Sequence, residues 1–116
     1  MENEKKATLW LVIPCYNEEQ VIDETAKCVK KIMTGMEESG KISKNSKIAF
    51  VNDGSSDKTL EHIKTLCADD GIFACINLSR NRGHQNALLA GLMVAKEYAD
   101  AVISTRCGPS GRCRRD

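Results

Sequence analysis

The feature that most constrains the fold is an apolar run, residues 48–51, that leads into the polar sequence Asn-Asp-Gly-Ser-Ser-Asp. Consecutive apolar residues are typical of a strand buried on both faces. Gly54 permits a sharp turn, and the serines and aspartate after it are candidate helix caps. Asp53 is therefore expected at the carboxyl end of a parallel strand, where open α/β sheets bind ligands. An ordinary strand-to-helix turn is the alternative, because Asp-Gly-Ser is common turn chemistry.

Apolar runs and helical periodicity alternate along the rest of the chain. Four strands are predicted, at residues 7–14, 48–51, 72–78 and 100–104. Pro14 is expected to end the first of them. Three helices are predicted. The first starts near Asn17 and Gln20, which resemble a capping box, and ends near Gly40. The second runs from about residue 60 to 70, and the third covers 87–96. This alternation indicates an α/β fold: a three-layer, Rossmann-like parallel sheet with helices on both faces.

Composition limits the class of protein. The 116 residues support one small domain, and 41% hydrophobic with 28% charged residues is globular. A net charge of +1 argues against nucleic acid as a partner. No apolar run approaches the roughly 20 residues that span a bilayer, and the charged start does not resemble a signal peptide. Six cysteines without a Cys-x-x-Cys pair favour reduced thiols and a cytoplasmic location over a disulfide or zinc site.

The three strand-to-helix loops are expected at one edge of the sheet. The first holds Tyr16, Asn17 and Glu18, the second Asp53, Gly54 and Ser55, and the third Arg80, Arg82, Gly83 and His84. Such an edge could hold a base and ribose at one end and phosphates at the other, with help from N–H groups at helix starts. The alternatives are a packing role for Tyr16, an ordinary loop role for His84 and solvated arginines. Neither Gly-x-Gly-x-x-Gly nor a Walker-type lysine loop is present.

Three stretches in register carry a family resemblance. They are Val12-Ile-Pro-Cys-Tyr-Asn-Glu-Glu19, Val51-Asn-Asp-Gly-Ser-Ser-Asp-Lys-Thr59 and Ser79-Arg-Asn-Arg-Gly-His-Gln-Asn-Ala-Leu-Leu-Ala-Gly91. Together they resemble the amino-terminal half of family 2 glycosyltransferases with the GT-A fold, nearest to polyprenyl-phosphate sugar transferases of the dolichol-phosphate mannosyltransferase and bactoprenol glucosyltransferase types. The resemblance covers residues 8–104, and it implies that residues 1–104 form an incomplete nucleotide-sugar-binding domain.

The resemblance places seven residues around a UDP- or GDP-linked sugar: Pro14, Tyr16, Glu18, Asp53, Ser55, Gly83 and His84. Those of the first loop would border the nucleoside, Asp53 would accept a hydrogen bond from the base, and Ser55 would lie close by. Gly83 and His84 would approach the ribose and phosphates, although relatives often carry Lys at the second position and neutral imidazole has no charge. No residue of this chain is assigned a catalytic role.

The resemblance ends after the fourth strand. Relatives continue into an Asp-x-Asp element that holds Mg²⁺ or Mn²⁺ against the donor diphosphate, and a lipid phosphate is the acceptor; here Arg106 follows Thr105 and no such ligands stand in the chain. One back-translation of residues 106–116, read a base later, gives Asp-Ala-Asp-Leu-Gln-Asp-Asp-Val-Asp-Ala. Residues 105–116 are therefore interpreted as a non-native, frameshifted tail. A functional basic tail with a Cys pair is the alternative, but two thiolates are too few for a closed zinc site.

Three hypotheses of function follow from these residues. The first is a truncated family 2 glycosyltransferase that is inactive alone, and the second is a non-catalytic nucleotide-binding or regulatory α/β module. The third is a flavodoxin-like structural domain in which Asp53 is a phosphoacceptor or a turn residue. Replacing Asp53 with Ala is expected to abolish nucleotide binding at little cost in stability, because an exposed loop carboxylate makes few contacts.

Overall fold

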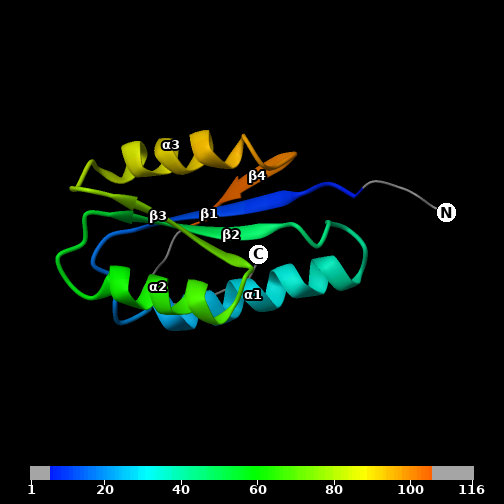
Figure 1. Ribbon diagram of the computed structural model, residues 1–116, viewed down its shortest axis with the longest axis horizontal. Helices are drawn as coiled ribbons and strands as arrows, with labels where there is room; N and C mark the ends of the chain where they lie inside the picture. The colour runs from blue at the N-terminus through cyan, green and yellow to red at the C-terminus, as the bar shows by residue number, and fades with distance from the viewer. Residues whose placement is uncertain (1–5, 106–116) are drawn as a thin grey trace.

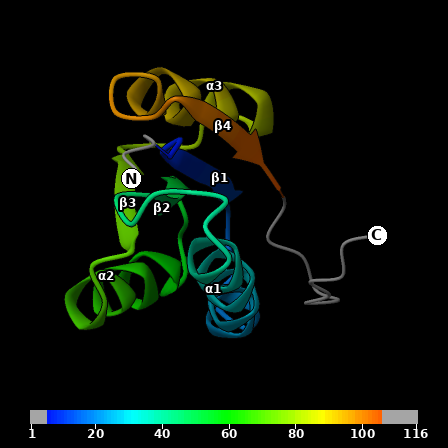
Figure 2. The same ribbon diagram turned by 90° about the vertical axis from the view of Figure 1, so that its right-hand side faces the viewer.

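The computed structural model describes residues 6–105, in which strands and helices alternate. The elements are β1 (Leu9–Cys15), α1 (Ile22–Glu38), β2 (Lys47–Asp53), α2 (Thr59–Asp69), β3 (Phe73–Leu78), α3 (His84–Ala95) and β4 (Ala101–Ser104). All strand pairs are parallel, in the order β3-β2-β1-β4. Helices α1 and α2 cover one face of the sheet and α3 covers the other (Figures 1 and 2). The predicted three-layer α/β architecture is thus confirmed.

Each face of the sheet carries its own hydrophobic cluster, because successive side chains of a strand point to opposite faces. Ile13 of β1 and Phe50 of β2 belong to the cluster under α1 and α2, whereas Val12 and Val51 belong to the cluster under α3. Phe50 also stacks on Phe73, with ring centroids 5.8 Å apart. Continuous apolar runs in β1 and β2 therefore have the meaning that the sequence predicted: both strands are buried on both faces.

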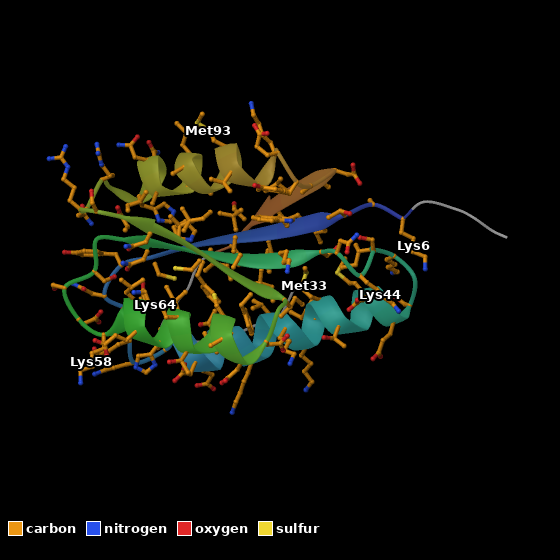
Figure 3. All side chains as sticks on the ribbon, in the orientation of Figure 1. Lys6, Met33, Lys44, Lys58, Lys64 and Met93 are labelled. Carbon is orange, nitrogen blue, oxygen red and sulfur yellow. The ribbon has the colours of Figure 1, made fainter. Side chains whose placement is uncertain are left out.

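Helix α3 is apolar on its outer side as well. Leu89 and Met93 are 53% and 56% exposed, and Figure 3 shows Met93 pointing away from the sheet, whereas Met33 of α1 points toward it. On the inner side, Gly91 lies so close to the sheet that an added Cβ would stand 2.5 Å from Val12 Cγ1 and 2.8 Å from Val51 Cγ2. The distance between α3 and the sheet is therefore set by a residue without a side chain.

Gly91→Ala is expected to lower the free energy of unfolding by about 1–3 kcal/mol, because the methyl group must displace two buried valines. Urea denaturation measures the change. Gly35→Ala in α1 is the matched control: nothing lies within 4 Å of its added Cβ, so helix propensity alone should raise stability by up to about 1 kcal/mol. Equal effects of the two substitutions would contradict the close packing at Gly91.

Several predicted boundaries are wrong in instructive ways. Strand β1 continues through Pro14 to Cys15; β4 ends opposite Val12, so Pro14 has a neighbouring strand on one side only and its missing N–H is tolerated. Helix α3 begins at His84, three residues before the predicted start. Helix α1 begins at Ile22 without a side-chain cap, so the capping box predicted at Asn17 and Gln20 does not form.

The cysteines follow the prediction of reduced thiols in part. Cys67 and Cys75 are free and partly buried at the interface of α2 with the sheet, and burial raises the pKa of both thiols. Cys28 of α1 is disulfide-bonded, which contradicts the expectation at that position. Along residues 6–105, no helix combines the length and the apolar character needed to cross a bilayer.

Candidate functional site

The three strand-to-helix loops lie at the carboxyl edge of the sheet (Figure 1). A cavity of about 470 Å³ is lined by residues of all three loops. It is lined by Pro14, Cys15, Tyr16, Glu18, Asp53, Asn81, Gly83 and His84. Six of the seven predicted binding residues are among these, so the fold does bring the first, second and third loops together. Ser55 is not part of the lining. Its hydroxyl instead accepts a hydrogen bond from the Asn17 N–H at 2.9 Å.

Hydrogen bonds from backbone N–H groups of the second loop to side chains of the first join these two loops. Asn17 adopts a left-handed conformation with φ 52°, and its Oδ1 accepts the N–H of Ser56 at 2.8 Å and of Asp57 at 3.3 Å. The Glu19 Oε1 accepts the N–H of Lys58 at 2.7 Å. An Asn tolerates this backbone conformation better than most residues. Asn17, which was predicted to cap α1, therefore accepts hydrogen bonds from N–H groups in the second loop, just before α2 begins.

Asp57 has a similar function at the start of α2. Its Oδ1 accepts the N–H of Thr59 at 2.9 Å, and the Thr59 hydroxyl accepts the N–H of Glu18 at 2.8 Å. Burial alone would raise the pKa of Asp57, but hydrogen bonds from Thr59 and from the Glu19 N–H outweigh it and hold the pKa below the ordinary value. Burial raises the pKa of Glu18, and the charge of Asp57 adds to that rise.

Glu18→Gln is expected to stabilise the fold slightly at pH 7. Because the pKa of Glu18 is higher in the folded chain than its ordinary 4.5, ionised Glu18 costs stability above the folded value, and the cost is absent below 4.5. The gain in stability should therefore shrink as pH falls toward 4.5. Because Glu18 is partly exposed and solvent screens its charge, the gain should be smaller than the stabilisation expected for Gly35→Ala. Melting temperatures between pH 4 and pH 8 measure it; a gain that grows on acidification would contradict the sign.

Asp53 ends β2 and is 2% exposed, which corrects the expectation of an exposed loop carboxylate. Its Oδ1 accepts the N–H of Arg82 at 2.7 Å, and its Oδ2 accepts the Asn81 side-chain amide at 3.2 Å. The next residue, Gly54, has φ 66°, and an added Cβ would stand 2.2 Å from the Asn81 backbone nitrogen. The third loop thus lies directly on the end of β2, where it forms hydrogen bonds with Asp53 and packs closely against Gly54.

The third loop delivers the start of α3 to the cavity. Gly83, with φ 93°, is the N-cap, and the first turn contains no acidic residue. The first N–H groups of a helix have no partner within the helix, and the helix dipole makes that end favourable for anions. Since Gly83 and His84 both line the cavity, one end of the cavity has groups suited to phosphate oxygens. Asp53 supplies acceptor oxygens elsewhere in the same cavity.

Two residues of the lining were missed by sequence reasoning. Cys15 is buried between two predicted residues, and Asn81 precedes Gly83 by two positions in the third motif. Nothing in a single sequence shows that the Asn81 amide turns back to β2, 28 residues away. Its place inside the motif was the one available signal.

The described residues contain no cluster of potential metal ligands. Within residues 6–105, no group of three Asp, Glu, His or Cys side chains is arranged to hold a metal ion. The position of the Asp-x-Asp element, and residues 106–116 of the tail predicted to be frameshifted, lie outside the described residues. No metal-dependent step is therefore assigned to the residues seen here.

Comparison with known proteins defines the class. The structure matches the mannosyltransferase PcManGT from Pyrobaculum calidifontis, in complex with GDP-Man and Mn²⁺, with a TM-score of 0.62 and 18% identity over 77% of this chain and 24% of that one. A parallel sheet of this topology, with its cavity at the crossover loops, is the fold of the GT-A class. The chain belongs to glycosyl transferase family 2, whose family model matches residues 10–103. Family membership counts against the flavodoxin-like hypothesis.

Two relatives show how much of such a protein the chain represents. It is 40% identical over 101 residues to the uncharacterized glycosyltransferase YkoT of Bacillus subtilis, covering 87% of this chain and 30% of YkoT. It is 38% identical over 93 residues to the prophage bactoprenol glucosyl transferase homolog of Escherichia coli, covering 80% of this chain and 28% of that protein. The chain thus spans less than a third of the length of either relative.

Proposed function

We propose that this chain forms the donor-binding part of a glycosyltransferase that uses a nucleoside diphosphate sugar. The observation that carries the proposal is the meeting of Asp53 and the start of α3 in one cavity. A carboxylate accepts hydrogen bonds from the N–H groups of a base, and a helix N-terminus favours a diphosphate. Tyr16, 46% exposed on the cavity wall, offers an aromatic face for stacking.

The relatives support the finer parts of the proposal. The bound GDP-Man of the structural neighbour supports a nucleotide sugar as donor, and its Mn²⁺ supports divalent metal use by the longer proteins of the family. The name of the bactoprenol glucosyl transferase homolog supports a polyprenyl phosphate as acceptor. The part proposed for residues 6–105 is recognition of the nucleoside and diphosphate, which needs no metal-dependent step.

Titration of the purified chain with UDP and with GDP tests the proposal. Binding to the folded state raises the melting temperature with ligand concentration, and calorimetry gives the affinity. We expect one of the two nucleotides to bind more tightly than its own nucleoside, because the nucleoside lacks the groups that the α3 N-terminus would hold. No binding of either nucleotide at millimolar concentration would contradict the proposal.

A further inference from the structure

The side-chain amide of Asn81 is fixed by a single residue. Its Nδ2 donates to the backbone oxygen of Asp53 and to Oδ2 of the Asp53 carboxylate, both at 3.2 Å. The next residue donates its backbone N–H to the other carboxylate oxygen. Both oxygens of a nearly buried carboxylate are thus held by consecutive residues of the third loop, and this sets the direction in which the remaining lone pairs of the carboxylate point.

The same contacts connect the two ends of the cavity. Asn81 lies two residues before Gly83, the N-cap of α3, and both residues line the cavity together with Asp53. A loop tied to the end of β2 at Asn81 holds the start of α3 at a constant separation from Asp53. Binding sites gain affinity when such separations are set before the ligand arrives.

We propose that Asn81 is a positioning residue for the nucleotide: it aims the Asp53 carboxylate at the base and holds the phosphate end of the cavity in register with it. The proposal rests on the proposed function and deepens it. Asn81 acts through Asp53 and through the loop, so its substitution should change binding without removing either of the groups that would contact the ligand.

Asn81→Ala and Asn81→Asp test the proposal, with UDP and GDP as probes. Asn81→Ala is expected to weaken binding of the preferred nucleotide about tenfold or more, because a hydrogen bond to a charged group is lost. Asn86→Ala is the matched control: the Asn86 amide donates to the Arg82 backbone oxygen at 2.8 Å, so it removes a hydrogen bond to the same loop without touching Asp53. An equal loss in the control, or no loss in Asn81→Ala, would overturn the proposal.

Asn81→Asp adds a readout that a purely structural role does not predict. A second carboxylate beside Asp53 repels it at neutral pH, whereas at lower pH the pair shares one proton and the donated hydrogen bond returns. Affinity relative to the wild type should therefore recover between pH 7.5 and pH 5. Glu18, His84 and Tyr16 line the same cavity and Arg80 and Arg82 flank Asn81, so the wild-type profile over that range is the reference. Affinity that stays low throughout would contradict the assignment.

Hydrogen exchange separates failure of this proposal from failure of the proposed function. In the ligand-free chain, the Arg82 N–H is protected by Asp53, and Asn81→Ala should speed its exchange because the carboxylate is then free to rotate. If the wild type binds neither nucleotide, the proposed function fails, and the Arg82 exchange rate still tests the contact. Unchanged exchange in Asn81→Ala would overturn the positioning role.

Discussion

Gly54→Ala is expected to have the largest effect on stability of any single methyl group in the described fold, about 3 kcal/mol or more. Its Cβ would stand 2.2 Å from the Asn81 nitrogen and 2.4 Å from the Arg80 carbonyl carbon. Backbone atoms cannot rotate aside as a side-chain end can, so the third loop must move as a unit. The φ of 66° adds strain for any residue with a Cβ.

The measurement is the free energy of unfolding in urea, together with nucleotide affinity for any variant that folds. Gly83→Ala is the matched control, because its φ is also positive, at 93°, while nothing lies within 4 Å of its added Cβ. It shares the backbone strain and lacks the collision. If the two variants lose equal stability, the close approach of the third loop to Gly54 is not the cause.

Asp53→Ala is expected to abolish nucleotide binding and also to cost about 1–3 kcal/mol of stability. The second effect arises because the Arg82 N–H loses its acceptor, and the Asn81 amide keeps only the backbone oxygen of residue 53, in a largely buried place. This differs from the expectation drawn from the sequence, in which Asp53 was an exposed carboxylate. Asp69→Ala, at the exposed end of α2, is the control and should leave both quantities nearly unchanged.

Calorimetric titration and urea denaturation of the same protein preparations measure the two effects of Asp53→Ala. Affinity for UDP and GDP equal to that of the wild type would remove Asp53 from the site. Lost affinity with unchanged stability would mean that the contacts from the third loop contribute little to the fold. The two quantities are therefore informative separately.

The architecture could be predicted because it depends on patterns that are local in the sequence. The apolar run at 48–51 and the polar sequence after it predicted a buried strand that ends at a ligand-binding edge. The buried strand is observed, and a cavity lies at its end. The cavity lining was largely predictable because parallel strands place their crossover loops at one edge. Where a family motif marked a loop, the sequence contained enough information to name most of the lining.

The details that could not be predicted are contacts between loops. Asn17 and Gln20 satisfied the local rule for a capping box, but Asn17 bonds to Ser56 and Asp57, 39 and 40 residues further on. Asp53 looked exposed because its burial depends on Asn81 and Arg82 of the third loop. Local sequence rules cannot show that a side chain will prefer a hydrogen-bond partner far along the chain to one nearby, since the distant partner becomes adjacent only after the sheet has formed.

The parallel sheet has one further consequence, for how the chain can be rebuilt. Every helix-to-strand connector, including residues 39–46 between α1 and β2, lies at the edge opposite the three loops (Figure 1). That edge is where new termini, a fluorescent reporter or a surface tether can be introduced a full strand length away from the ligand. A circular permutant opened there keeps all three strand-to-helix loops covalently intact.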